Sequence, residues 1–151
     1  AGAPPTYQYV GANARTLPDN WESLGDMGWL DTEGYLYLAD RRSDMILIGG
    51  ANVYPAEVEA ALEEHPAVQS CAVIGLPDDD LGNTVYAIVQ LRSDVTETEL
   101  KTHLEARLAS YKRPRAFEFV TEPLRDEAGK IRRSALRAER IEKQAASAAP
   151  G

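Results

Sequence analysis

From residue 45 onward the sequence alternates between short apolar runs and helical patterns, and this alternation limits what the chain can fold into. Three runs have the length and the β-branched or aromatic content of strands, at residues 68–76, 85–91 and 117–120. Apolar residues that recur at helical spacing predict helices at residues 55–65, 96–108 and 134–143. We therefore predict an α+β fold over residues 45–143, with a three-stranded sheet packed by helices around one small core.

Particular residues set the ends of the predicted helices. Pro55 suits the first turn of a helix, and the pair His65-Pro66 ends that helix. Thr96 and Glu99 have the spacing of a capping box, which predicts the start of the second helix. Residues 144–151 are rich in Ala, Ser, Pro and Gly, and we predict that they form a disordered tail.

Residues 1–41 have a different character, rich in Gly, Pro, Asp and aromatic residues. Short strand-like pieces at 7–10, 27–30 and 35–38 predict β-hairpins, with a turn at Asp31-Thr-Glu-Gly34. An isolated hairpin is only marginally stable in water, and these pieces are too few to build a core. We expect them to be the edge of a larger N-terminal domain.

Composition excludes several functions. The net charge of -8 argues against nucleic acid as a partner. No run approaches the ~20 apolar residues of a transmembrane helix. The single cysteine, Cys71, has no partner for a disulfide or a thiolate metal site, and we predict no metal site in the chain. It fits a buried apolar residue in a reducing compartment, so we expect a cytoplasmic protein.

The pair Gly129-Lys130 is the strongest local candidate for chemistry. Lysine carries a compact charge with three donors, and glycine lets the backbone approach a ligand closely, which suits a phosphate group. Residues 111–143 hold ten Lys or Arg against six Asp or Glu, a local excess of +4 that leaves -12 for the rest. Either this stretch is a phosphate-facing surface, or its charges only solvate a helix and loops.

Three stretches in order resemble a known family. They are Leu-Gly-Asp-Met-Gly-Trp-Leu-Asp-Thr-Glu-Gly-Tyr at 24–35, Asp-Arg-Arg-Ser-Asp-Met-Ile-Leu-Ile-Gly-Gly-Ala-Asn-Val-Tyr-Pro-Ala-Glu-Val-Glu at 40–59, and Asp-Glu-Ala-Gly-Lys-Ile at 126–131. The chain resembles the adenylate-forming enzymes, which include acyl-CoA synthetases, peptide-synthetase adenylation domains and luciferases. The resemblance covers nearly the whole chain. It implies that 1–41 end the large N-terminal domain, 42–44 are the hinge and 45–143 are the small C-terminal domain.

The resemblance also implies a two-step reaction. A carboxylic acid reacts with ATP to give an acyl-adenylate and pyrophosphate, and CoA then displaces AMP. Lys130 corresponds to the catalytic lysine of the first step. Asp26 and Arg41 correspond to residues that bind ATP or AMP, and a carboxylate is suited to accept hydrogen bonds from ribose hydroxyls. The glycine loop Gly49-Gly50 corresponds to the loop that lines the family's CoA tunnel.

The hinge departs from the family pattern. Ser43 stands where the family usually has aspartate or lysine. Arg42, Ser43 and Asp44 are therefore all candidates for the residue whose backbone dihedral angles change when the small domain rotates. Leu24 stands where threonine usually precedes the Gly-Asp pair, so any hydroxyl contact at that position is lost.

The resemblance implies ATP, Mg²⁺ and CoA as cofactors or co-substrates, with Mg²⁺ held mainly by the N-terminal domain. The expected partners are a small carboxylic acid and that domain of the same protein. The closest family pattern is that of bacterial fatty-acid or bile-acid CoA ligases. Two alternatives stay open, a peptide-synthetase adenylation domain that loads a carrier protein and a non-catalytic interaction module.

Overall fold

The computed structural model describes residues 15–16, 22–23, 26–41 and 44–148, and the chain divides into two compact units. Unit 1 comprises residues 1–43, and unit 2 comprises residues 44–151. No helix among the described residues is long and apolar enough to cross a membrane.

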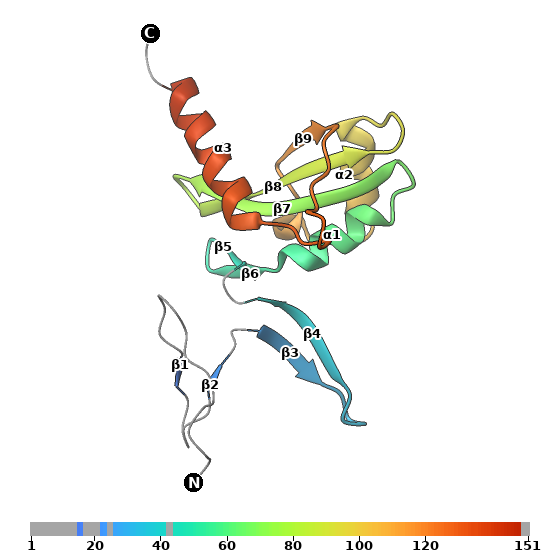
Figure 1. Cartoon of the computed structure of the whole chain (residues 1–151), viewed down its shortest axis with the longest axis vertical. Coiled ribbons are helices and arrows are strands. Elements are labelled where there is room, and N and C mark those ends of the chain that lie inside the picture. Colours follow the sequence, from blue (N-terminus) through green and yellow to red (C-terminus); the bar gives the residue numbers. More distant parts are fainter. Residues whose placement is uncertain (1–14, 17–21, 24–25, 42–43, 149–151) are drawn as a thin grey trace. The chain divides into compact units, whose positions relative to one another are not determined.

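The described part of unit 1 contains two antiparallel strand pairs (Figure 1). Strand β1 (Arg15–Thr16) pairs with β2 (Glu22–Ser23), and β3 (Asp26–Leu30) pairs with β4 (Leu36–Arg41). The second pair is the hairpin predicted at 27–30 and 35–38. The strand-like piece at 7–10 lies outside the described residues.

The turn of the β3–β4 hairpin is organised by one carboxylate. Asp31 Oδ1 accepts the backbone N–H groups of Glu33 and Tyr35, each at 2.9 Å. Gly34 has a φ of 87°, which only glycine adopts freely. The backbone N–H of Tyr35 is the main cause that lowers the pKa of Asp31. The predicted turn therefore has both the glycine and the side-chain acceptor that it needs.

Unit 2 is built on a three-stranded sheet with the order β7-β8-β9. Strands β7 (Val68–Asp78) and β8 (Gly82–Leu91) are antiparallel, and β9 (Ala116–Val120) is parallel to β8. A parallel pair needs a crossover, and α2 (Glu97–Glu105) with a 3₁₀ turn (Ser110–Lys112) provides it. The predicted α+β fold with a three-stranded sheet is confirmed.

Helices cover both faces of this sheet (Figure 1). One face packs on α1 (Pro55–Glu63) and α2 through the main apolar core. The other packs on α3 (Arg133–Ala148) through a smaller apolar cluster. Successive residues of β7 serve the two cores in turn, since Val73 belongs to the first and Ile74 to the second. The sheet is thus the middle layer that positions everything else in unit 2.

The helix boundaries confirm two predictions and correct a third. Pro55 begins α1, and Thr96 and Glu99 form both reciprocal hydrogen bonds of a capping box at α2. The predicted disordered tail is wrong for residues 144–148, which continue α3. Gln and Ala are good helix formers, so the helix propagates past its last apolar contact with the sheet. Residues 149–151 lie outside the described residues.

Gly75 lets strand β5 (Ile46–Ile48) lie close to β7. An added Cβ at Gly75 would lie 2.8 Å from Ile46 Cγ2, and Ile46 is buried and β-branched, so it cannot turn away. We expect Gly75→Ala to lower the free energy of unfolding by about 1–3 kcal/mol, measured by urea denaturation. The loss should shrink in an Ile46→Ala background. Equal stability of Gly75→Ala and the native protein would contradict the close packing.

Candidate functional site

The loop that carries Lys130 is closed by the carboxylate of Asp126. Asp126 Oδ1 accepts the backbone N–H groups of Ala128 at 3.0 Å and Lys130 at 2.9 Å. The backbone N–H of Asp126 donates to the carbonyl of Lys130 at 3.0 Å, and that of Gly129 donates to the carbonyl of Asp126 at 2.8 Å. Gly129 has a φ of 75°. Four hydrogen bonds within five residues make this a stiff loop rather than a flexible turn.

Two arginines brace the same loop from outside. Arg125 donates to the carbonyl oxygen of Gly129 at 3.1 Å, and Arg132 Nε lies 3.3 Å from Asp126 Oδ2. The side chain of Lys130, at the C-terminal end of this loop, is exposed. A shallow groove of about 280 Å³ lies beside it, lined in part by Leu124, Leu136 and Glu139. The loop therefore presents one lysine to solvent on a braced backbone.

Lys130 differs from every other lysine of the chain. All four lysines lie within the described residues, and Lys101, Lys112 and Lys143 each form a salt bridge with a glutamate. The ammonium group of Lys130 has no acidic partner in the part of the chain that the structure describes. A lysine without a partner keeps its three donors available for an anion.

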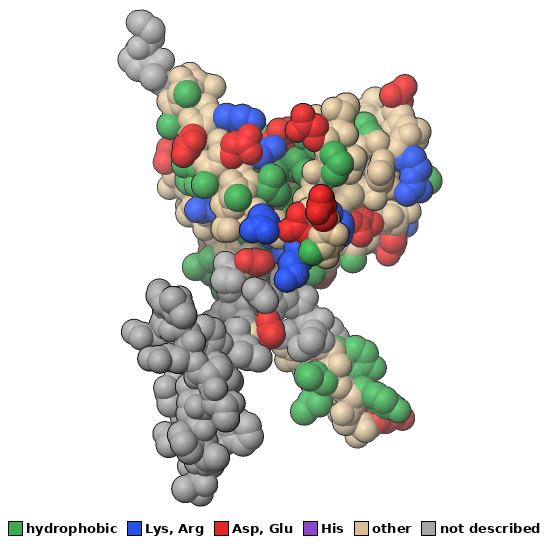
Figure 2. Space-filling model, viewed as in Figure 1, with side chains coloured by type: hydrophobic (Ala, Val, Ile, Leu, Met, Phe, Trp, Pro, Cys, Tyr) green, Lys and Arg blue, Asp and Glu red, His purple; other side chains and the backbone are tan. Residues whose placement is uncertain are grey.

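Most cations of the basic stretch 111–143 are paired with carboxylates of the chain. Eight of its ten cations form salt bridges with described carboxylates, and Arg137 donates to the carbonyl oxygen of Gly75. Figure 2 shows basic and acidic side chains interspersed on the visible face of unit 2. Among the described residues, Lys130 is the one cation of this stretch whose side chain has neither a carboxylate nor a carbonyl partner.

Gly49 and Gly50 form a two-residue hairpin turn between β5 and β6 (Ala51–Val53). Their φ values of 53° and 87° are both positive, as a type I′ turn requires. The backbone N–H of Gly49 donates to the carbonyl of Leu81 at 3.0 Å, which fixes this turn on the turn between β7 and β8. Any ligand that contacts this turn meets bare backbone, because no Cβ is present.

The backbone positions of the two candidate nucleotide-binding residues, Asp26 and Arg41, are neighbours in unit 1. Asp26 and Arg41 are opposite one another in the register of β3 and β4, and Asp26 is exposed. Of the three hinge candidates, Arg42 and Ser43 lie outside the described residues. Asp44 is described, and it forms an ion pair with Arg133 within unit 2.

Sequence reasoning missed the buried ionic cluster around Arg133. The guanidinium of Arg133 binds both carboxylate oxygens of Glu59, which is 6% exposed. One signal was available in the sequence. Glu59 lies four residues after Pro55 and three before Leu62, so the helical period places it on the buried face of α1. An acidic residue at such a position needs a buried partner.

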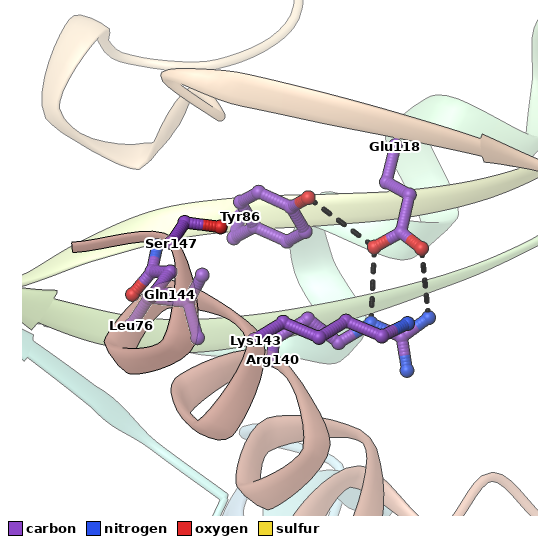
Figure 3. Close-up of a pocket in the computed structure, with 7 residues that line it drawn as sticks. All are labelled: Leu76, Tyr86, Glu118, Arg140, Lys143, Gln144 and Ser147. Carbon is purple, nitrogen blue, oxygen red and sulfur yellow. Dashed lines mark hydrogen bonds and ion pairs between the residues drawn. The ribbon is translucent and has the colours of Figure 1, made fainter. Parts of the chain in front are cut away.

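A second arginine of α3, Arg140, lies seven residues further along the helix and lines an open pocket (Figure 3). Arg140 binds both oxygens of Glu118 at 3.0 Å, and the hydroxyl of Tyr86 donates to Glu118 at 3.2 Å. The Arg140 guanidinium lowers the pKa of Glu118, and burial is the main cause that raises the pKa of Tyr86. The side chains of Tyr86, Glu118 and Arg140 bind one another, and their contacts connect α3 to β8 and β9.

The Lys130 loop should respond to acid through Asp126. The backbone N–H of Lys130 is the main cause that holds the pKa of Asp126 below its ordinary value of 3.8. The charged carboxylate therefore stabilises the loop above pH 3.8, and this contribution is lost as the pH falls through the lowered pKa. We expect the amide shifts of Ala128 and Lys130 to titrate together in NMR, with a midpoint below 3.8.

Asp126→Asn is the control for this titration. Asparagine keeps the acceptor oxygen and cannot ionise in this range, so the loop should persist and the acid transition of both amides should disappear. A midpoint at or above the ordinary value in the native protein would show that the carboxylate does not hold the loop.

Comparison with known proteins gives this site a context. The family model of the AMP-binding enzyme C-terminal domain matches residues 57–130, from the first turn of α1 to the candidate lysine. The chain therefore contains a region, residues 57–130, that matches the AMP-binding enzyme C-terminal domain. The predicted resemblance to adenylate-forming enzymes is thereby confirmed.

Curated relatives of this AMP-binding C-terminal domain are CoA ligases. The chain is 44% identical to a 2-succinylbenzoate–CoA ligase of Bacillus cereus over 126 residues, which cover 83% of the chain and 26% of the relative. It is 46% identical to a long-chain-fatty-acid–CoA ligase of Bacillus subtilis over 131 residues, which cover 85% of the chain and 23% of the relative. The chain thus spans about a quarter of the length of these relatives, at their C-terminal part.

Solved structures agree with the fold. An o-succinylbenzoate CoA synthetase from Bacillus subtilis, in complex with its acyl-adenylate intermediate, matches 81% of the chain with a TM-score of 0.75 at 41% identity, over 25% of its own length. A fatty acyl CoA synthetase of Mycobacterium tuberculosis matches 85% with a TM-score of 0.70 at 40% identity, over 26% of its length. The chain therefore shares the fold of the C-terminal part of these synthetases.

Proposed function

We propose that this chain is the C-terminal part of an ATP-dependent acid–CoA ligase and that it supplies the catalytic lysine. One observation carries the proposal. Lys130 is the lysine that the described structure leaves without an acidic partner, and it stands on a braced loop where the matched domain ends. A preorganised cation with free donors is what the adenylation step needs.

In the first step, a carboxylate oxygen of the substrate attacks the α-phosphorus of ATP. A P–O bond forms, the bond to pyrophosphate breaks, and negative charge moves onto the leaving group. The ammonium of Lys130 stabilises this charge, and the hydrogen bonds of Asp126 hold the loop so that little reorganisation accompanies the reaction. In the second step, the CoA sulfur attacks the acyl carbon and AMP leaves.

The other candidate residues bind the substrates or let the small domain move between the two steps. Asp26 and Arg41, which are register partners, contact the ribose and phosphate of the nucleotide. The backbone of Gly49 and Gly50 lines the path of the CoA chain, where a side chain would intrude. Residues 42–44 act as the hinge between a large N-terminal domain, which ends at residue 41, and the unit that carries Lys130.

The co-substrates follow from the same proposal. ATP and CoA are consumed, and a carboxylic acid is activated. The names of relatives, which refer to 2-succinylbenzoate and long-chain fatty acids, support testing both aromatic and aliphatic acids. A related synthetase has been solved with ATP and a magnesium ion. We assign Mg²⁺ mainly to the N-terminal domain, as the family resemblance implies.

The acceptor and the location complete the proposal. The relatives are named as CoA ligases, which favours CoA over a carrier protein as the acceptor. Cys71 is a free and fully buried thiol, and burial raises its pKa far above the ordinary value of 9.0. A structural thiol of this kind suits the reducing cytoplasm.

The test uses the full-length protein that carries this chain, with ATP, Mg²⁺ and CoA. It would be incubated with a panel comprising 2-succinylbenzoate, anthranilate and saturated fatty acids of increasing length. We expect AMP and an acyl-CoA thioester to accumulate in equal amounts with at least one class of acid. Release of ADP in place of AMP, or no acid-dependent AMP with any member of the panel, would contradict the proposal.

A further inference from the structure

Arg133, the first residue of α3, joins two carboxylates from separate parts of unit 2. Its Nε and one terminal nitrogen bind the two oxygens of Glu59 at 3.0 and 2.6 Å. The other terminal nitrogen lies 3.0 Å from Asp44 Oδ2. Such a bidentate pair fixes orientation as well as distance. We call Asp44, Glu59 and Arg133 the Arg133 cluster.

The Arg133 cluster is attached to the core of unit 2. The side chains of Arg133 and Glu59 are 19% and 8% exposed. Glu59 Oε1 also accepts the backbone N–H of Val73 in β7 at 2.9 Å, and the thiol of Cys71 donates to the Glu59 carbonyl at 3.6 Å. A buried charge held by several partners has one allowed position. The cluster therefore fixes the start of α3 against α1 and β7.

The cluster also joins two places that matter for the proposed reaction. Asp44 is the first residue of unit 2 and directly follows residues 42–43 of the proposed hinge. Arg133 follows Lys130 by three residues. The Lys130 loop is itself closed by Asp126, so little freedom remains between the lysine and the helix start. The side chain of Arg133 thus connects Asp44, at the hinge end of unit 2, to residues 126–133, which we call the Lys130 arm.

We propose that Arg133 is a positioning residue that holds the Lys130 arm at a fixed orientation to the hinge end of unit 2. This inference rests on the proposed function. Rotation about the hinge then carries Lys130 as part of a rigid body to the site where the acyl-adenylate forms. Without the cluster, the arm and the hinge end shift relative to one another, and the ammonium misses the developing charge.

The same helix provides a matched control. Arg140 also binds a carboxylate in bidentate fashion, that of Glu118, and the two side chains are 9% and 26% exposed. This pair, shown in Figure 3, ties α3 to β9. It includes neither Asp44 nor a residue of the Lys130 loop. Loss of either arginine's bidentate geometry should disturb the packing of α3, but only Arg133 should affect catalysis.

The experiment compares Arg133→Lys and Arg140→Lys in the full-length enzyme, with the acid that the panel identifies. Arg133→Lys should lower kcat of ATP–pyrophosphate exchange about 10- to 100-fold, because misplacement by about 1 Å has such effects, while KM for ATP stays within about twofold. Arg140→Lys should stay within about threefold at a comparable loss of Tm. Asp44→Asn, which keeps the Arg133–Glu59 pair, should give a smaller fall in kcat.

A double-mutant cycle separates positioning from general destabilisation. If Arg133 acts through Lys130, Arg133→Lys leaves the residual exchange rate of the Lys130→Ala enzyme unchanged. The inference is overturned if Arg133→Lys lowers that residual rate by the same factor as in the native enzyme, or if both arginine variants lower kcat equally. A native enzyme that shows no exchange with any acid would instead contradict the proposed function.

Discussion

Replacing Lys130 with alanine is expected to lower acid-dependent ATP–pyrophosphate exchange by about 100- to 1000-fold in the full-length enzyme. The physical reason is the loss of a preorganised cation at the point where charge moves onto pyrophosphate. The substitution should leave the fold intact, because the side chain of Lys130 is exposed and the loop bonds to Asp126 come from its backbone. Unchanged Tm with lost exchange is therefore the expected combination.

Two other lysines are matched controls for Lys130. Lys101 and Lys143 are exposed and form helical salt bridges four residues apart with Glu97 and Glu139. Pairs of this kind contribute only about 0.3–0.5 kcal/mol. Their alanine variants should keep exchange within about twofold of the native rate. A Lys130→Ala enzyme that behaved like these two controls would remove Lys130 from the catalytic step.

Replacing Gly50 with leucine is expected to lower the formation of thioester from supplied acyl-adenylate by about 100-fold, while exchange falls by less than about tenfold. The turn at Gly49 and Gly50 is proposed to line the CoA path, and leucine would place a side chain in that path. Apart from its two chain neighbours, no described heavy atom lies within 4 Å of an added Cβ at Gly50, so the side chain has room to project outward.

The φ of 87° at Gly50 means that leucine also brings backbone strain of about 1–3 kcal/mol. Gly34 is the matched control for this strain, since its φ is also 87° and no heavy atom lies within 4 Å of an added Cβ. Gly34→Leu should therefore lower Tm by a similar amount without a selective loss of thioester formation. If both variants lost the two half-reactions alike, strain and not the CoA path would explain the effect.

Periodic and local features of this fold were accessible from the sequence. The strands of the sheet, the Thr96–Glu99 capping box and the Asp31–Gly34 turn all follow from residue type at short range. The predicted sites at Lys130 and at Gly49-Gly50 likewise fall on turns whose geometry requires glycine. In each case the interactions that decide the structure join residues close in sequence.

Long-range ionic pairing was not accessible in the same way. Arg133 and Glu59 are 74 residues apart, and Lys112 and Glu57 are 55 apart, so no local pattern indicates which charges meet. This is why the basic stretch 111–143 suggested an anion-binding surface, although salt bridges neutralise most of it. Only the three-dimensional pairing reduces ten candidate cations to Lys130. The same pairing reveals the connection between Asp44 and the Lys130 arm.

The most direct test of the central claim is a single-turnover experiment that measures the two half-reactions of the full-length enzyme separately. One reaction supplies acid and ATP, and the other supplies acyl-adenylate and CoA. The Lys130→Ala enzyme should form acyl-adenylate about 100- to 1000-fold more slowly than the native enzyme, yet convert supplied acyl-adenylate to thioester at nearly the native rate. Equal loss of both reactions would contradict the assignment of Lys130 to adenylation.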